Sequence, residues 1–354
     1  MAAAAPQDHN HYVPVLKGKA GEYQALAETQ VAARALISPL IELAPPDGKQ
    51  TIDQVCALFA TKIAKGWGAA DRLFVDTLRL DPTLMTASRR PPLELALQLA
   101  LATGFAPIPV TGISRSARYQ SVIAQHAAAQ GTGAALRLSG TDTRSATLGA
   151  DVAATLAQIA LAATDVDLII DVGPIVADVA AVLALGLNAL IRGLPHLADW
   201  RSFTVVSSSF PQPLTHRGVS RFPRVDWDFW QAILATTPAR KPAFGDYAIE
   251  TPGFVSFPAY IEPSAAIRFT TPTEWLVIRG TSIRKPPRFD QFRQLSRTLV
   301  GLRNDFRGPA FSWGDRFIYE CANGTGRVGN LTTWRAVGTN HHLETVADQL
   351  PTVP

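Results

Sequence analysis

The chain has 354 residues, of which 47% are hydrophobic and 18% charged, and its net charge is +4. This apolar content excludes wholesale disorder, and the length suggests two domains of ordinary size. Two cysteines, Cys56 and Cys321, are too few for a disulfide scaffold or a four-thiolate zinc site. We therefore expect two buried thiols in a reducing compartment.

The N-terminal segment MAAAAPQDHNHYV lacks the basic start of a signal peptide, and its alanine run ends quickly at Asp8. The most apolar long stretch, from Pro174 to Ile191, carries Asp178 and Asn188. It therefore predicts a buried or half-buried helix rather than a membrane span. Together these features predict a cytoplasmic protein without membrane contact.

Eight short apolar runs rich in β-branched residues recur along the first 250 residues, and each precedes a longer Ala- and Leu-rich stretch. The runs begin at Tyr12, Ile37, Arg72, Ala106, Ala134, Val166, Ser202 and Pro242. The 25 to 40 residues between successive starts leave room for a helix each time, as parallel β-α-β crossovers require. Most runs are continuously apolar, which is typical of strands buried on both faces.

The stretches between these runs show helical patterns. Gly21 to Leu36 predicts one helix, Thr51 is a candidate N-cap of the next, and a third begins with a proline and ends at Gly104. Eight strands alternating with helices predict a (β/α)8 barrel over residues 1–252, with an open doubly wound sheet as the alternative. In a barrel we expect one parallel sheet that buries Leu40, Phe74, Ile108, Ile169 and Val205.

The pattern changes after Gly253. AAIRFTTPTEWLVIRG predicts two strands, FDQFRQLSRTLVGLRNDF a basic amphipathic helix, and DRFIYECA a further strand. Residues 253–354 are thus expected to form a basic α+β appendage that packs on the barrel. Between Arg268 and Arg335 there are 12 Lys or Arg against 5 acidic residues, so the basic character lies in this part.

Polar side chains stand within or at the ends of the predicted strands, where barrel active sites lie. A carboxylate in an apolar strand is costly unless it is paired or functional. The candidate catalytic residues are Glu42, Asp76, Asp171 and Asp246. The candidate ligand-binding residues are Lys17, Lys19, Glu22, Arg79, Arg137, Ser207 and Tyr247.

Two interpretations of this set remain open. In the first, the four carboxylates hold a divalent cation or act as acid and base, beside Lys17, Lys19 and Arg137 for an anion. In the second, the same residues pair internally and close the barrel mouth. Both require one shared end of the barrel for Lys17, Glu42, Asp76, Arg137, Asp171 and Asp246.

Other motifs carry little chemistry. Gly324, Gly326 and Gly329 match a dinucleotide-binding pattern, but only 25 residues follow, so a glycine-rich turn is expected. His341 and His342 are adjacent and point apart on any regular element, which disfavours a shared zinc ion.

The appendage interleaves basic residues with aromatic ones, as single-stranded nucleic-acid surfaces do. The alternative is an ordinary small core with a solvated basic rim. The candidate nucleic-acid contacts are Arg284, Lys285, Arg288, Arg293 and Arg297.

Three segments carry a family resemblance: YVPVLKGKAGEYQAL from Tyr12, ISPLIELAP from Ile37 and WRAVGTNHH from Trp334. In these segments the chain resembles the beta family proteins. This is a group of proteins from bacteria and phages that is named after a bacteriophage beta protein. The resemblance implies a context of phage–host conflict, either anti-phage defence or counter-defence, and implies no reaction. It also favours Lys17, Lys19, Glu22 and Glu42 as site residues, because they lie within the matching segments.

Three hypotheses for function follow. The first is a protein that binds an anionic ligand, such as nucleic acid or a nucleotide, at the barrel mouth. The second is a hydrolase that cleaves phosphoesters with the strand-end carboxylates and a divalent cation. The third is a non-enzymatic scaffold whose basic face docks a partner protein.

Overall fold

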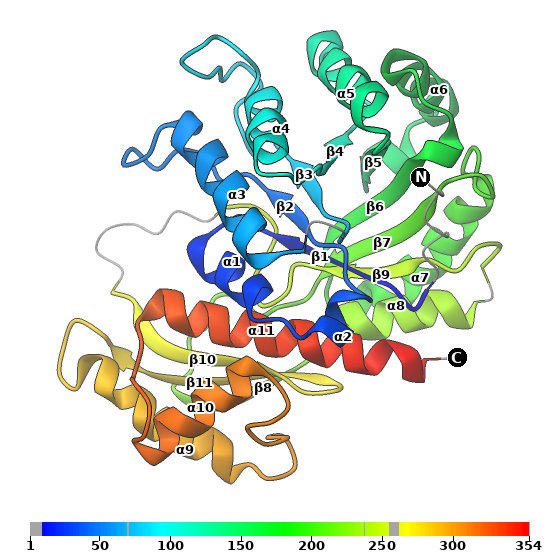
Figure 1. Ribbon diagram of the computed structural model, residues 1–354. Helices are drawn as coiled ribbons and strands as arrows, with labels where there is room; N and C mark the ends of the chain where they lie inside the picture. The colour runs from blue at the N-terminus through cyan, green and yellow to red at the C-terminus, as the bar shows by residue number, and fades with distance from the viewer. Residues whose placement is uncertain (1–8, 69–70, 237, 255–261, 354) are drawn as a thin grey trace.

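The computed structural model describes residues 9–68, 71–236, 238–254 and 262–353. Eight parallel strands form a closed barrel in the order β1-β2-β3-β4-β5-β6-β7-β9, so the predicted barrel is confirmed and the open sheet is wrong. Figure 1 shows this barrel in the upper part of the molecule. Its strands are β1 (Tyr12–Leu16), β2 (Leu40–Glu42), β3 (Phe74–Asp76), β4 (Ile108–Thr111), β5 (Ala134–Ser139), β6 (Val166–Pro174), β7 (Ser202–Ser208) and β9 (Ala243–Asp246).

Helices cover the outside of the barrel, so its strands are buried on both faces over most of their length. The five strand residues expected to be inaccessible are confirmed at 6% exposure or less. The first predicted helix is broken in two, whereas Thr51 caps the next helix and Pro92 opens the third, as predicted. The helices are α1 (Ala20–Ala27), α2 (Val31–Arg34), α3 (Ile52–Gly66), α4 (Pro92–Ala102), α5 (Ala117–Gln130), α6 (Leu148–Ile159), α7 (Ala177–Gly193) and α8 (Val225–Ala235).

The apolar stretch from Pro174 contains α7, which is half-buried as expected. Its C-terminal half packs on the barrel through Leu187 and Ile191, while Val182 and Leu185 near its middle are exposed. Within the described ranges, no helix combines the length and apolarity needed to cross a bilayer.

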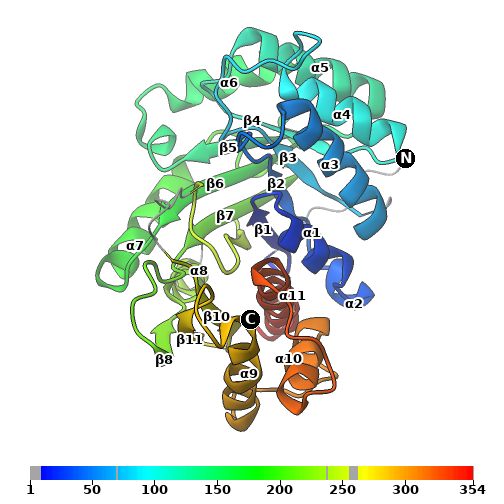
Figure 2. The ribbon, with the colours of Figure 1, turned by 90° about the vertical axis from the view of Figure 1, so that its left-hand side faces the viewer.

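The appendage is a three-stranded antiparallel sheet in the order β10-β11-β8, covered by helices (Figure 2). β10 (Ser264–Thr270) and β11 (Glu274–Ser282) are the two predicted strands, and α9 (Gln291–Gly301) is the predicted basic helix. The segment DRFIYECA was expected to be a strand, and this is wrong: it lies in α10 (Trp313–Asn323). Ser312 caps α10, and Gly324 ends it in the left-handed conformation, so the glycine motif is a turn.

The domain boundary expected after residue 252 does not divide the structure into two separate units, because elements on both sides of it pack together. β8 (Gly218–Pro223) belongs to the barrel segment in sequence but pairs with β11. α11 (Leu331–Gln349) lies between the barrel and the small sheet. Val337 of this helix packs in the appendage core, whereas Leu343 and Val346 pack in the barrel core.

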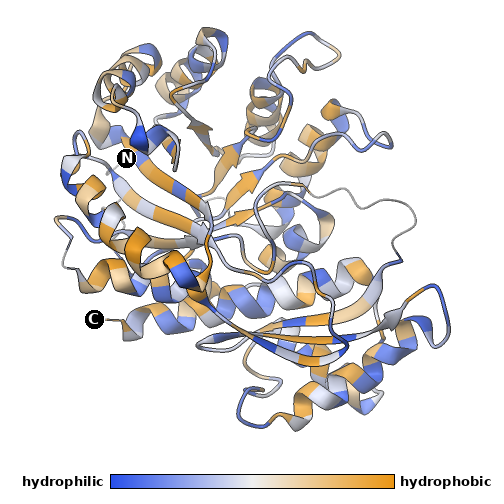
Figure 3. Ribbon diagram, turned by 180° about the vertical axis from the view of Figure 1, so that it is seen from behind, coloured by the Kyte–Doolittle hydropathy of each residue, from blue (hydrophilic) through white to orange (hydrophobic). Residues whose placement is uncertain are grey.

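Helix α11 is polar in sequence and yet almost wholly buried. In Figure 3 the barrel strands are largely orange, while α11, which ends at the C mark, shows long blue and white stretches. Its polar groups are hydrogen-bonded to both sides: Asn340 accepts from the backbone N–H of Gly314 (2.9 Å) and donates to the carbonyl of Ala25 (3.2 Å). α11 thus joins the barrel and the appendage by directional contacts.

Candidate ligand site at the barrel mouth

The carboxyl ends of parallel strands meet at one end of a barrel, here called the mouth. Because side chains alternate along a strand, the residues two positions after an interior residue also face the interior. Leu40, Phe74, Ala135 and Ile169 belong to the apolar core inside the barrel. The residues two positions further on are Glu42, Asp76, Arg137 and Asp171, and they form the next layer toward the mouth.

Arg137 is the centre of this layer. One terminal nitrogen, Nη1, donates to Glu42 (2.9 Å) and Asp76 (2.8 Å). The other, Nη2, donates to Asp171 (2.6 Å) and to the hydroxyl of Tyr247 (2.7 Å). Tyr247 in turn donates to Asp171 (2.6 Å). The planar guanidinium therefore donates to three carboxylates from three different strands.

Two further arginines neutralise this layer. Arg79 contacts Glu42 (3.2 Å), and Arg115 contacts Asp76 (2.8 Å). Burial alone would lower the pKa of Arg137, but Tyr247 and the facing carboxylates raise that pKa well above its ordinary value. Three arginines thus balance three carboxylates, and the interior of the mouth is closed by ion pairs.

This pairing bears directly on the two interpretations of the carboxylates. Glu42, Asp76 and Asp171 share one end of the barrel as predicted, and each accepts from Arg137. Among the described residues, no group of three or more His, Cys, Asp or Glu is arranged to hold a metal ion. The geometry of these three carboxylates is that of internal ion pairs. Above them lies a cavity of about 60 Å³, lined in part by Arg115, Arg137 and Asp171.

A second charged group lies at the mouth beside β9 and β1. Glu250 accepts from Arg268 of β10 and Arg335 of α11, and Lys17 lies 3.6 Å away. Burial would raise the pKa of Glu250, but these three cations lower it to about 2. The appendage therefore supplies two arginines to the barrel mouth.

Lys19 and Glu22 lie next to this group. Glu22 is buried in the first turn of α1 and accepts from the backbone N–H of Lys19 (3.0 Å). Burial, followed by repulsion from Arg335, lowers the pKa of Lys19. We call Lys17, Lys19, Glu22, Glu250, Arg268 and Arg335 the Glu250 cluster. It contains four cations and two carboxylates.

Asp246 does not belong to the mouth, so its predicted place with the other three carboxylates is wrong. Tyr247 faces the barrel interior, and the preceding side chain of Asp246 therefore faces outward. It accepts from the hydroxyl of Tyr12 (2.5 Å) and from Nε2 of His342 on α11 (2.8 Å). Ser207 likewise follows an interior residue, Val206, and faces outward as a buried residue.

The two adjacent histidines point apart, as predicted. Both ring nitrogens of His341 lie 2.7 Å from an oxygen, of Asp315 and of the Thr270 backbone. Burial lowers the pKa of His342 although Asp246 acts against it. A neutral ring that donates from Nε2 to an ionised Asp246 is consistent with this direction. Both histidines join α11 to its neighbours.

The basic helix α9 uses two of its arginines within the fold. Arg293 donates to the carbonyl of Gly326 (3.4 Å) and Arg297 to that of Ala322 (3.0 Å), at the end of α10. The aromatic residues Phe292, Phe317 and Trp334 form the appendage core. The nucleic-acid contacts expected of Arg284, Lys285, Arg288, Arg293 and Arg297 stay a prediction; all of these except the half-buried Arg293 are exposed.

Comparison with known proteins gives the family. The model of the Beta protein family matches residues 12–348. The chain belongs to the Beta protein family. No curated protein matches the sequence.

Two solved structures are among those that are similar to this Beta protein family member. Triosephosphate isomerase from Bartonella henselae has 14% sequence identity and a TM-score of 0.37, over 67% of this chain and 92% of that chain. A putative dihydrodipicolinate synthase family protein from Coccidioides immitis has 11% identity and a TM-score of 0.36, over 68% of each chain.

The segments that resemble the family converge in space. Lys17, Lys19 and Glu22 come from the first segment, and Arg335 comes from the tail segment. All four are in the Glu250 cluster. Sequence reasoning missed Glu250, Arg268, Arg335 and Arg115. Arg115 could have been found, because it follows the fourth strand directly, but the appendage arginines give no such signal.

Proposed function

We propose that this Beta protein family member binds a small anionic ligand at the barrel mouth, on the Glu250 cluster. The observation that carries the proposal is the local excess of positive charge. Four cations gather around two carboxylates there, whereas the neighbouring Arg137 layer is balanced. The side chains of Arg268 and Arg335 keep 22% and 26% exposure, so solvent reaches the arginines.

The state of Lys19 supports an anion as the ligand. Its pKa is lowered because the ammonium is partly buried and faces Arg335. An anion between these two groups would offset both effects, and it would gain charge-assisted hydrogen bonds from a lysine and an arginine. Phosphate groups suit such a pair, because arginine binds two oxygens and lysine acts as a point charge. A nucleotide or another phosphorylated molecule is therefore the ligand class that we propose.

The other two hypotheses have less support. The hydrolase requires carboxylates that are free to hold a cation, and Glu42, Asp76 and Asp171 are occupied by Arg137. The scaffold hypothesis is compatible with a closed mouth but gives no role to the excess charge of the Glu250 cluster. A cytoplasmic role in phage–host conflict stays a prediction of the family resemblance.

The test is calorimetric titration with inorganic phosphate, AMP, ATP and a short single-stranded DNA. Lys19→Ala should weaken the tightest binder by at least about tenfold, since a hydrogen bond to a charged group contributes about 1.5–3 kcal/mol. Lys62→Ala, at an exposed position on α3, is the matched control and should bind as the wild type does. Equal affinities for both variants, or no binding of any probe at low salt, would contradict the proposal.

A further inference from the structure

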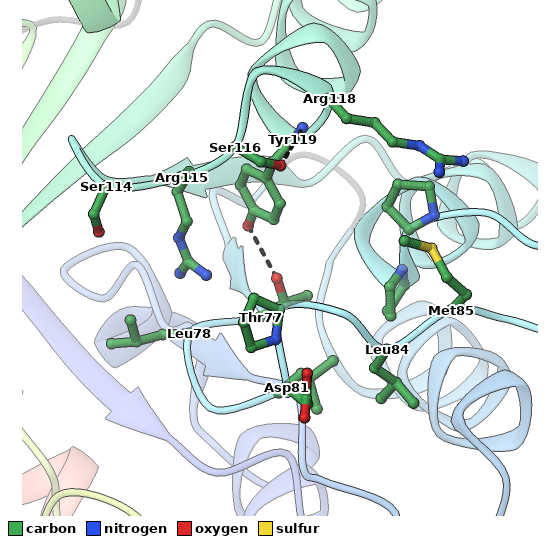
Figure 4. A pocket seen from close by; sticks show the side chains of 14 residues that line it. Thr77, Leu78, Asp81, Leu84, Met85, Ser114, Arg115, Ser116, Arg118 and Tyr119 are labelled. Atoms are coloured by element: carbon green, nitrogen blue, oxygen red, sulfur yellow. Dashed lines mark hydrogen bonds between the residues drawn. The ribbon is translucent and has the colours of Figure 1, made fainter.

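A separate cavity of about 280 Å³ lies on the β3–β4 side of the mouth, between the loops that follow these two strands. Figure 4 shows Leu78, Leu84 and Met85 on one side of it and Ser114, Arg115 and Tyr119 on the other. This volume is close to the lower end of small-molecule sites, which begin at about 300 Å³. None of its lining residues belongs to the Glu250 cluster.

One wall of the cavity is cationic. It contains Arg115, Arg118 and the capping residue Ser116, where the 14-residue helix α5 begins. Arg115 is bound to Asp76, but Arg118 donates only to the carbonyl of Arg89 (2.9 Å) and has no carboxylate partner among the described residues. The partial positive charge of a helix N-terminus adds to that of Arg118.

The opposite wall is apolar and partly open to solvent. Leu78 and Met85 are 40% and 38% exposed, which is high for large apolar side chains next to a cavity. A ligand that covers them would remove apolar surface from water. Asp81 is the acidic residue on this wall, and its carboxylate accepts from the backbone N–H (2.8 Å) and hydroxyl (2.6 Å) of Thr83.

The wall between the two is rigid. The hydroxyl of Tyr119 donates to the carbonyl of Val110 (2.9 Å) and accepts from Thr77 (3.1 Å). The guanidinium of Arg115 lies 4.8 Å from the centre of the Tyr119 ring. Because these side chains are already fixed, a ligand would lose little free energy in ordering them.

We propose that this cavity binds a phosphate monoester that carries one compact, flat apolar group. The phosphate lies at Arg118 and the start of α5, and the apolar group packs between Tyr119 and the wall of Leu78 and Met85. The site is distinct from the Glu250 cluster, so this proposal is tested independently of the function proposed above.

The probe is phenyl phosphate, compared with inorganic phosphate and with phenol by calorimetric titration of the full chain. We expect phenyl phosphate to bind at least about tenfold more tightly than either part alone. Arg118→Ala should weaken binding about tenfold, the loss expected for one charge-assisted contact. Ser114→Phe, at an exposed position on the rim, should block the cavity.

Arg192→Ala, an exposed arginine on α7, is the matched control, and Lys19→Ala tests independence from the Glu250 cluster. Neither should change the affinity for phenyl phosphate. Melting curves show whether Ser114→Phe is folded, and Arg118→Ala provides the test if it is not. Inorganic phosphate binding as tightly as phenyl phosphate, or binding that survives both Arg118→Ala and Ser114→Phe, would overturn the proposal. So would the absence of saturable binding.

Discussion

Replacing Arg137 with methionine is the sharpest test of the ion-paired mouth. Methionine keeps much of the side-chain volume but leaves Glu42, Asp76 and Asp171 buried without their common cation. Breaking a buried ion pair by removing one partner costs about 3–5 kcal/mol. Unfolding entropy of about 2.1 cal/mol/K per residue, taken over 354 residues, gives about 0.7 kcal/mol per degree. We therefore expect Tm to fall by about 4–7 °C.

The assay is thermal and urea denaturation followed by circular dichroism at pH 7.5. Arg192→Met, at an exposed position, is the matched control and should leave Tm unchanged. Arg137→Lys should lie between wild type and Arg137→Met, because an ammonium keeps the charge but not the five-donor geometry. If Arg137→Met and the control have the same Tm at pH 7.5, the ion pairs do not stabilise the fold and this reasoning is refuted.

Three further predictions concern helix packing and the buried charges between barrel and appendage. Gly21→Ala places a methyl group 2.7 Å from the carbonyl oxygen of Thr332 on α11, so it should destabilise the fold by about 1–3 kcal/mol. Gly149→Ala places its methyl group in open space and should stabilise the fold by about 0.5–1 kcal/mol. Urea titrations measure both changes in the free energy of unfolding. Burial raises the pKa of Asp226 to about 6, so Asp226→Asn should increase Tm more at pH 8 than at pH 5; equal gains would contradict that pKa. Burial lowers the pKa of His342, so wild-type stability should fall relative to His342→Gln as pH drops below about 6.5, and parallel Tm profiles would argue against a buried neutral ring.

The barrel could be predicted from sequence because its strands obey one simple rule. A parallel strand that is buried on both faces is a continuous apolar run, and the regular spacing of eight such runs specifies the crossovers. The convergence of Glu42, Asp76, Arg137 and Asp171 follows from the same rule. Their partners do not, because the pairing of three carboxylates with one arginine depends on side-chain geometry across the barrel.

Asp246 shows where strand-end reasoning needs one more step. Its position near the end of a strand was correct, but the side chain faces outward because Tyr247 occupies the interior position. Alternation along the strand decides between the two neighbours, and the sequence alone does not say which is the interior one. The result is an Asp that is paired with His342 far along the chain.

The errors in the appendage have a different cause. DRFIYECA mixes β-branched and aromatic residues in a short segment, and such segments do not distinguish a helix from a strand. α11 gives no amphipathic pattern, because its polar residues are buried against partners on several sides. β8 is largely exposed, so it lacks the apolar run that identified the barrel strands.

The position of α11 has a consequence for how barrel and appendage share stability. The helix packs beside α1, although the two helices lie far apart along the chain. Its residues Leu343 and Val346 belong to the same apolar core as Tyr12 and Phe244, on the outer face of β1 and β9. Without α11 that core would lose apolar contacts, and the appendage would lose its main link to the barrel. We therefore expect a change that weakens α11 to destabilise the barrel and the appendage together.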